Sequence, residues 1–363
     1  MITAMRTDTE PLTESGVELL EEMLAIPSPS TQERQLGQWL VSRLRAMGFA
    51  ARRDDVGNVI AYWGGGPKEV MLLGHIDTVP GFIPVRREGD RLFGRGAVDA
   101  KGPLAAAITA VARQPVGTGW RLTIVGAVEE EGTSRGARHL VSRRAPDQLV
   151  ILEPSGWDAV TLGYKGSLRL RYRLAIPMGH GAGPNDSAGD KAIAFVRRVQ
   201  DYAAEQAPRS KTGASIPTFE RLDVRVLRFH ADHDGFQDTA AMTLGFRLPP
   251  DFDVASLRAQ LHAWSDGAEL RFDYADAAVR AEKNTPVVRA FLKGIRDAGG
   301  TPRFKMKTGT SDMNILTPAW GCPALAYGPG DSRLDHTPHE AIELDEFRRG
   351  VEVLATALHQ LTA

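Results

Sequence analysis

The sequence predicts an α/β fold into which a smaller α+β domain is inserted. Short runs rich in Val, Ile and Leu alternate with helical stretches in the first 164 residues, and again from Pro286. This rhythm is typical of a β-α-β sheet covered by helices on both faces. Between these parts, apolar residues alternate with arginine, as in half-solvated antiparallel strands. We therefore expect a mixed, mostly parallel sheet in a catalytic domain formed by residues 1–164 and 278–363, with residues 165–277 as a separate insertion.

The first part begins with two predicted helices, because apolar residues recur at helical spacing in 15–24 and 33–47. Gly48 ends the second of them. Three apolar runs with little alternation then predict strands that are covered on both faces. These runs are 69–74, 121–128 and 148–153, and the predicted helices between them are 101–113 and 134–144.

The pattern changes after Tyr164. The insertion is predicted to contain strands 166–176, 222–231, 240–248 and 269–274, a Gly-rich turn at 179–189, and helices 190–207 and 254–265. The α/β pattern then returns with a helix at 286–298, strands in TPRFKM and ALAYG, and a closing helix from Leu344. The order of these segments supports an insertion rather than two consecutive domains.

Composition excludes several classes of protein. The chain has 363 residues, of which 42% are hydrophobic and 25% charged, and these are ordinary globular proportions. A net charge of −1 gives no general reason to expect nucleic acid or an anionic membrane as a partner. The single cysteine, Cys322, allows no intrachain disulfide and is not expected to be a nucleophile. The N-terminus has no apolar core like that of a signal peptide and reads as a frayed leader, with the fold starting near Glu14, so we expect a soluble, cytoplasmic protein.

Carboxylates and histidines follow apolar runs in a regular order along the chain. They are His75 and Asp77 in GHIDTVPG, Asp99 in GRGAVDAKGP, Glu129, Glu130 and Glu131 in VGAVEEEG, Glu153 in LVILEP, and His336 in LDHTPHE. In α/β sheets, reactive groups collect at the carboxyl ends of the strands. Hard oxygen and imidazole nitrogen ligands without thiolate suit a hydrolytic zinc site. This set therefore predicts two metal ions and metal-assisted hydrolysis of an amide.

In their order, these motifs resemble the M20 family of metallo-peptidases and deacylases, from GHIDTVP to DHTPHEAIEL. The wording of GRGAVDAKGP, ILEPSGWD and KTGTSDMNIL is closest to a narrower branch of that family. Enzymes of that branch release lysine or ornithine from a small amino-group carrier protein in lysine and arginine biosynthesis. The resemblance also implies a homodimer formed through the inserted domain.

The resemblance assigns a role to each residue of the predicted metal site. His75 and Glu153 would bind one metal ion, Glu130 and His336 the other, and Asp99 would bridge both. The metals are expected to be zinc, with cobalt or manganese also suited to these ligands. Asp77 follows His75 by two residues in an extended segment, so it can accept the second N–H of the imidazole. A cis peptide bond between Asp99 and Ala100 is also implied.

Three consecutive glutamates leave the register of the catalytic base open. Aligned on Gly132, the family pattern makes Glu129 the general base and Glu130 the ligand, and it leaves Glu131 to solvent. Adjacent side chains point apart unless the backbone turns, so the two glutamates can serve different functions. Many relatives have Asp before the glutamate pair, whereas this chain has Val128.

The resemblance also suggests residues that bind substrate. His180 in GHGAGP would donate to the developing oxyanion across a dimer, and Arg247 would hold a substrate carboxylate. An ordinary loop histidine and a surface arginine are the alternatives. Gly309 and Thr310 would line the substrate loop, and Asp312 would read a lysine ammonium. His339 is expected at the surface or behind the ligands.

The leading hypothesis is hydrolysis of the amide between an amino acid's α-amine and the γ-carboxyl of a carrier protein's terminal glutamate. A deacylase of small N-acyl amino acids such as N-acetylornithine, a dipeptidase, a di-metal phosphatase and a metal-binding scaffold without activity are the alternatives. The basic segments 303–307 and 143–144 could dock an acidic carrier, although a solvated charged face explains them as well.

Overall fold

The computed structural model describes residues 10–115, 117, 119–180, 183–206, 217–273 and 275–363. The chain forms two compact units. Unit 1 contains residues up to Gly163 together with Ala281–Met306 and Ser311–Ala363, and unit 2 contains Tyr164–Arg280 and Lys307–Thr310. The predicted insertion, 165–277, ends within three residues of the main segment of unit 2. The short segment 307–310 was not anticipated.

Among the described residues, a nine-stranded sheet has the order β1-β2-β6-β3-β7-β15-β8-β13, with β14 also paired to β8. Its strands are β1 Ala50–Arg53, β2 Val59–Gly64, β3 Lys68–His75, β6 Trp120–Ala127, β7 Gln148–Ile151, β8 Ala159–Tyr164, β13 Val279–Arg280, β14 Arg303–Lys307 and β15 Ala324–Ala326. The central strands β6, β3, β7 and β15 are parallel, whereas β1, β2 and β8 pair antiparallel. The predicted mixed, mostly parallel sheet is therefore confirmed.

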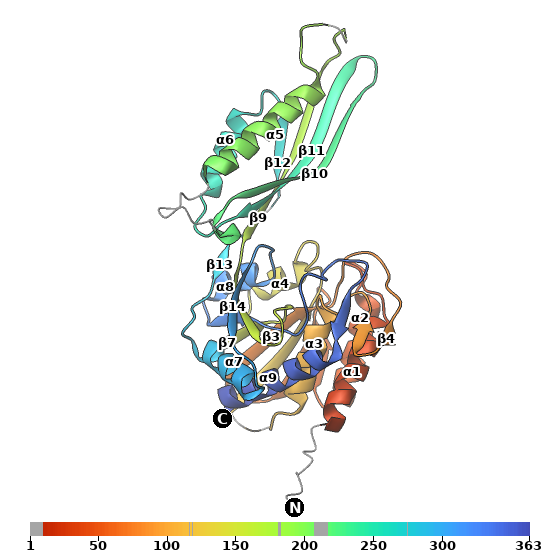
Figure 1. Cartoon of the computed structure of the whole chain (residues 1–363), viewed down its shortest axis with the longest axis vertical. Coiled ribbons are helices and arrows are strands. Elements are labelled where there is room, and N and C mark those ends of the chain that lie inside the picture. The colour runs from red at the N-terminus through yellow and green to blue at the C-terminus, as the bar shows by residue number, and fades with distance from the viewer. Residues whose placement is uncertain (1–9, 116, 118, 181–182, 207–216, 274) are drawn as a thin grey trace, which may run out of the picture. The chain divides into compact units, whose positions relative to one another are not determined.

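Helices of unit 1 pack on this sheet and on one another. They are α1 Glu10–Leu24, α2 Arg34–Ala46, α3 Lys101–Ala112, α4 Arg135–Leu140, α7 Pro286–Asp297, α8 Met313–Trp320 and α9 Leu344–Thr362. Helices of this unit form one layer in which α1 packs on α3, α3 on α9, and α9 on α7 (Figure 1). Eleven of the twelve residues of α3 are buried, which explains why its sequence is apolar on all sides. Among the described residues, no helix combines the length and apolar character that a membrane crossing requires.

A small antiparallel sheet of order β16-β5-β4 lies beside the main one. It consists of β4 Arg86–Glu88, β5 Arg91–Phe93 and β16 Ala341–Glu343. Glu340 directly precedes β16, and Gly94 follows β5. Pairing of Ala341 with Phe93 therefore brings the chain around His336 next to the loop that carries Asp99.

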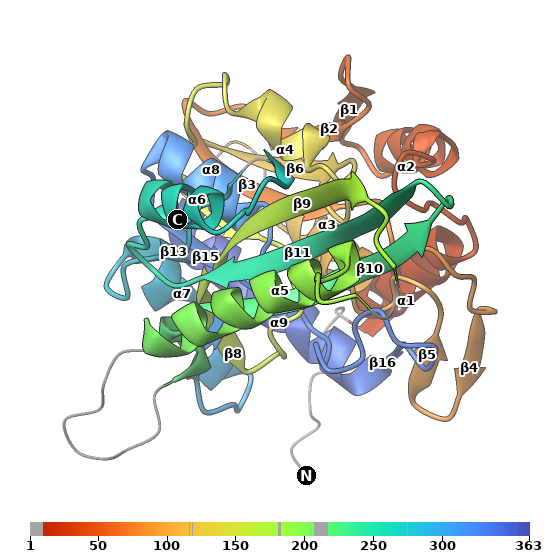
Figure 2. The same ribbon diagram turned by 90° about the horizontal axis from the view of Figure 1, so that it is seen from above.

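Among the described residues, unit 2 contains an antiparallel sheet of order β10-β11-β9-β12, together with helices. Its elements are β9 Gly166–Pro177, α5 Ala188–Glu205, β10 Asp223–His233, β11 Gln237–Leu248, α6 Val254–Ala263 and β12 Glu269–Phe272. Leu168, Leu170, Tyr172 and Leu174 alternate with exposed residues along β9 and pack with α5 and α6 in one apolar core. Figure 2 shows α5 lying along the strands of this sheet. Its N-terminus has a capping box formed by Ser187 and Asp190.

Most predicted elements are present, with ends shifted by a few residues. The first helix begins at Glu10 rather than near Glu14. Short or polar strands such as β1, β4, β5 and β16 were not predicted. Residues 1–9 of the expected leader, 181–182 of the Gly-rich turn, 207 of the predicted helix and 274 of the last predicted strand lie outside the described residues.

Candidate metal centre

Three neighbouring parallel strands bring the predicted ligands to one edge of the main sheet. His75 is the last residue of β3, the glutamates begin two residues after β6, and Glu153 lies two residues after β7. The register aligns Leu73 of β3 with Val125 of β6 and with Ile151 of β7, so β3 and β6 end level and β7 ends two residues earlier. His75, the glutamates and Glu153 therefore all lie at or just after the carboxyl ends of neighbouring parallel strands.

Asp99 lies between the two histidines. Its Oδ1 is 3.2 Å from Nε2 of His75, and its Oδ2 is 3.0 Å from Nε2 of His336. Glu153 Oε1 lies 4.0 Å from the same nitrogen of His75, and Glu131 Oε1 lies 2.7 Å from the nitrogen of His336. Each carboxylate oxygen of Asp99 thus faces a different histidine, as a bridging ligand requires. The implied cis peptide bond between Asp99 and Ala100 is also present.

The chemistry of this cluster fits two divalent cations. Two groups share Asp99: His75, Asp99 and Glu153 form one, and Asp99, Glu131 and His336 form the other. His75 also forms a group with Glu130 and Glu131, and in each group the ligand atoms lie within 4.8 Å of one another. All three groups offer only carboxylate oxygen and imidazole nitrogen, which suit zinc, cobalt and manganese. Several carboxylates held this close repel one another strongly unless cations lie between them.

The histidines and carboxylates of this cluster shift one another's pKa values. Burial alone would raise the pKa of Asp99, but hydrogen bonds from His336 and His75 hold it well below its ordinary value. Hydrogen bonds to Asp99 and Glu131 raise the pKa of His336 to about 10. Burial opposes the charged form of His75, yet Asp77 and Asp99 raise its pKa well above the usual value. Metal binding must therefore displace protons from both histidines.

Glu130, which is half-buried, and Asp312, which is buried, are two further carboxylates next to this cluster. Burial raises the pKa of Glu130 well above its ordinary value, and Glu153 and Asp312 add repulsion. Burial likewise raises the pKa of Asp312 to about 7. Neither oxygen of Asp312 has a hydrogen-bond partner of ordinary geometry among the described residues, although the nearby Ser134 hydroxyl and Arg138 partly oppose the rise of its pKa. Such a group is costly to bury unless a cation pairs with it.

The structure places the three glutamates differently from the alignment on Gly132. Glu131, assigned to solvent, instead contacts His336, and its side chain is only 9% exposed. Glu129, the expected base, is not brought into the cluster: its carboxylate accepts from Arg135 Nε at 2.7 Å and from Thr133 Oγ1 at 2.6 Å. The physical reason is a turn immediately after β6, where Glu129 has a φ of 60°. This turn directs the second and third glutamates, rather than the first and second, towards the cluster.

Asp77 fixes this turn. Its Oδ1 accepts from the main-chain N–H of Glu130 at 3.0 Å, and its Oδ2 accepts from that of Glu131 at 3.1 Å and from Ser30 Oγ at 2.7 Å. Nδ1 of His75 lies 2.9 Å from the main-chain oxygen of Asp77 and 3.5 Å from its carboxylate. The shorter contact orients the ring, so Asp77 supports His75 chiefly through its backbone.

Glu340 was not singled out from the sequence, although it belongs to the LDHTPHE motif. It is 1% exposed, and its Oε1 accepts from the main-chain N–H groups of Gly96, Val98 and Asp99 at 3.0–3.1 Å. Its Oε2 accepts from Arg95 Nη1 at 2.7 Å. A buried carboxylate thus holds the loop that presents Asp99. The only sequence signal was its position close after His336.

The other predicted residues lie in different parts of the chain. Arg247, near the end of β11, donates from Nη1 to Thr310 Oγ1 at 3.0 Å, so these two predicted substrate residues are neighbours within unit 2. Gly309 also belongs to unit 2, whereas Asp312 lies in unit 1 beside the metal cluster. His180 follows β9 in unit 2, and His339 is exposed.

The chain is similar to known proteins over most of its length. The sequence model of Peptidase family M20/M25/M40 matches residues 71–360. A Deinococcus radiodurans protein named "[LysW]-lysine hydrolase" is 42% identical over 97% of this chain and 98% of its own length. A Thermococcus kodakarensis protein named "Putative [LysW]-lysine/[LysW]-ornithine hydrolase" is 40% identical over 96% and 92%.

Among solved structures, the M20 family metallo-carboxypeptidase Sso-CP2 from Sulfolobus solfataricus superposes with a TM-score of 0.79. The superposition covers 96% of this chain and 99% of that one at 18% identity, which establishes a shared fold. The family match extends from β3, which ends in His75, through His336 into the closing helix. The chain therefore belongs to peptidase family M20/M25/M40 and is a hydrolase of that family.

Proposed function

We propose that this enzyme releases lysine, or ornithine, from an amino-group carrier protein. The bond cleaved would be the amide between the amino acid's α-amine and the γ-carboxyl of the carrier's terminal glutamate. The observation that carries this proposal is the similarity, over nearly the full length of both chains, to relatives whose names specify hydrolysis of carrier-linked lysine. Such a reaction belongs to lysine or arginine biosynthesis.

The proposed cofactor is a pair of divalent cations, zinc in the first instance and cobalt as the alternative. His75 and Glu153 would hold one ion, Glu131 and His336 the other, and Asp99 both. When bound, such ions supply Lewis acidity towards the scissile carbonyl and lower the pKa of water. The second ligand is thus Glu131 in place of the Glu130 expected from the sequence.

Glu130 is proposed as the general base, in place of Glu129. Its half-buried carboxylate lies outside the two groups around Asp99 and forms a group with His75 and Glu131, so it lies beside both proposed ions. The raised pKa of this carboxyl favours accepting a proton from the attacking water and returning it to the leaving amine. Glu129 would instead hold the turn through Arg135 and Thr133.

Recognition of the amino acid is proposed to use opposite charges. A lysine side-chain ammonium would pair with Asp312, because a buried carboxylate is stabilised by an incoming cation. Arg247 would bind the α-carboxylate bidentately, with Thr310 orienting the guanidinium. Gly309 would leave room for the substrate beside Thr310, and His180 would donate to the oxyanion.

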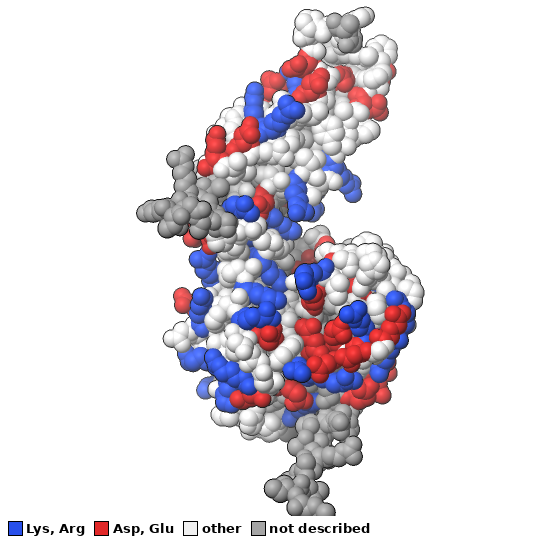
Figure 3. Space-filling view, viewed as in Figure 1, with Lys and Arg blue, Asp and Glu red and all other residues white. Residues whose placement is uncertain are grey.

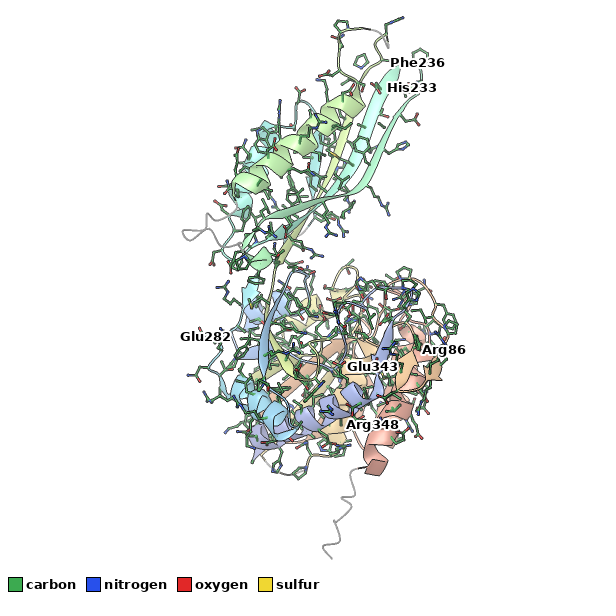
Figure 4. All side chains as sticks on the ribbon, in the orientation of Figure 1. Arg86, His233, Phe236, Glu282, Glu343 and Arg348 are labelled. Carbon is green, nitrogen blue, oxygen red and sulfur yellow. The ribbon has the colours of Figure 1, made fainter. Side chains whose placement is uncertain are left out.

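We further propose a homodimer formed through unit 2 and a cytoplasmic location. Strand β10 is an edge strand, and nine of its eleven residues are exposed, including Val226 and Phe229. Phe236 is 85% exposed and lies with His233 at the tip of the β10–β11 hairpin (Figure 4). An exposed, unpaired edge strand of this kind can pair with a second copy of the chain. The location rests on the single cysteine.

Release of free amino acid, measured by mass spectrometry, tests the function. Enzyme supplied with zinc or cobalt is offered carrier-linked lysine, carrier-linked ornithine and N-acetylornithine in parallel. The proposal expects fast release from the carrier conjugates alone. Equal or faster release from N-acetylornithine would identify a deacylase of small N-acyl amino acids, and cleavage only of unblocked dipeptides would identify a dipeptidase.

A further inference from the structure

The sheet of unit 2 has one face covered by helices and another that carries a dense set of arginines. Along β9, the buried Leu168, Leu170 and Tyr172 face α5 and α6, so Arg169, Arg171 and Arg173 project from the opposite face. Residues paired directly across antiparallel strands share a face. The register therefore identifies the other members of this surface, which we call the arginine face.

The register places further arginines beside those of β9. Arg169 and Arg225 flank Gly245, Arg171 and Arg228 flank Thr243, and Arg271 pairs with Arg171 from β12. With Arg173 and Arg247, seven arginines stand on this face. The strand carboxylates that the register places on the same face are Asp223, Asp232 and Glu269, whereas Asp238 of β11 is on the opposite face; Asp273 and Asp276 follow β12.

Several of these carboxylates are already paired at the margins of the face. Asp223 binds Lys165, Asp273 binds Arg171, and Glu269 binds Arg271. In contrast, no carboxylate among the described residues lies within 4 Å of the charged groups of four exposed arginines. These four are Arg169, Arg173, Arg225 and Arg228. The middle of the face is therefore positively charged without local compensation.

An apolar side chain lies within this charged surface. Strand β10 bulges between Val226 and Arg228, and the extra residue, Leu227, is 50% exposed. A Cβ placed on Gly245 would lie 3.0 Å from Cδ1 of Leu227, so the leucine lies over the glycine on the arginine face. An apolar contact ringed by arginines fits a protein surface better than a phosphate backbone.

We propose that the arginine face docks an acidic protein surface, and that its occupant is the carrier protein to which the amino acid is attached. This inference rests on the proposed function, because it names the partner surface that the same reaction requires. Charge complementarity is the argument. Uncompensated arginines attract clustered Asp and Glu side chains, raise the rate of encounter, and select against neutral or basic partners. Leu227 would provide the apolar contact.

Charge reversal on the face, with a matched reversal elsewhere on unit 2, tests this proposal. The variant is Arg169→Glu with Arg228→Glu. The control is Arg197→Glu with Arg198→Glu on α5, two exposed arginines on the helical side, where Figure 3 also shows basic side chains. Both doubles change the net charge equally. Each enzyme is assayed on carrier-linked lysine and on γ-glutamyl-lysine, which carries the same bond without the carrier.

For the variant on the arginine face, KM for the carrier conjugate should rise about tenfold or more, since attraction becomes repulsion. Its rate on γ-glutamyl-lysine should stay within about twofold of wild type, which also shows that the fold and catalytic residues are intact. The control should match wild type on both substrates. An unchanged KM for the conjugate, or an equal rise in the control, would overturn the docking proposal.

Failure of the proposed function gives a different result. If wild type releases no lysine from the conjugate, the docking surface can still be tested by measuring the dissociation constant of lysine-free carrier for wild type, variant and control. A dissociation constant raised by Arg169→Glu with Arg228→Glu, and not by the control, supports docking, and equal constants contradict it. Stronger competition for the carrier by duplex DNA than by poly-glutamate would instead identify phosphate as the ligand chemistry and overturn the acidic-protein assignment.

Discussion

Replacement of Glu340 should loosen the loop that presents Asp99. In Glu340→Ala, the N–H groups of Gly96, Val98 and Asp99 lose their shared acceptor, and Arg95 loses a partner at 2.7 Å. Each orphaned buried donor costs ~1–3 kcal/mol. Removal of one partner from a buried ion pair costs ~3–5 kcal/mol. Because water can enter the vacated space, we expect a total loss of ~3–5 kcal/mol in the free energy of unfolding.

The conservative replacement separates the hydrogen bonds from the charge. Glu340→Gln keeps an oxygen that can accept the three main-chain N–H groups and loses only the charged contact with Arg95. It should therefore cost ~1–2 kcal/mol. Metal affinity should fall about 10–100-fold in Glu340→Ala, as is typical when a residue that holds a metal ligand in place by hydrogen bonds is removed.

Denaturant unfolding of the metal-free protein measures the stability change, and competition with a chelator measures the affinity. The reasoning fails if Glu340→Ala unfolds within about 0.5 kcal/mol of wild type, the range of an ordinary surface substitution. It also fails if the alanine variant is destabilised but binds metal as tightly as wild type, since Glu340 would then have no part in positioning Asp99.

Three further predictions concern the same site. Glu130→Gln should lower kcat about 10²–10⁴-fold, as expected for loss of a general base, whereas Glu129→Gln should retain most of its activity; the reverse order in steady-state assays would restore Glu129 as the base. In the metal-free protein, stabilisation by His336 is fully present below about pH 6.5, its ordinary pKa, and is lost as pH rises through its folded pKa of about 10. Between these pH values, the free energy of unfolding should therefore depend less on pH in His336→Gln than in wild type. Gly136→Ala should destabilise the protein by ~1–3 kcal/mol in thermal unfolding, because the new Cβ would lie 2.4 Å from Asn58 Oδ1 and 2.6 Å from the Val128 nitrogen; a stability equal to wild type would show that the turn yields freely.

Predictions from the sequence were reliable where a local pattern determines the structure. Apolar runs of four to eight residues mark buried strands, and the first polar residue after each run must lie at the edge of the sheet. His75 and Glu153 were placed on that basis alone. The insertion was recognisable because arginine alternates with leucine along β9, which requires one wetted face.

Features that depend on backbone turns or distant contacts could not be read in this way. The three glutamates are chemically identical, and the positive φ of Glu129 decides which of them face His75 and His336. Glu340 acts on a loop more than 240 residues earlier in the chain, so no local pattern reveals its role. The short strand β16 is held by pairing with β5, far earlier in the chain, and β4 pairs with the adjacent β5; the sequences of β4 and β16 carry little β signal.

Metal content per chain tests the proposed site most directly. Wild type, Glu129→Gln and Glu131→Gln would be loaded with zinc, freed of excess metal, and measured by inductively coupled plasma mass spectrometry. The account predicts two ions per chain in wild type and in Glu129→Gln, and about one in Glu131→Gln, because only Glu131 joins Asp99 and His336. Loss of an ion from Glu129→Gln while Glu131→Gln retains both would contradict it.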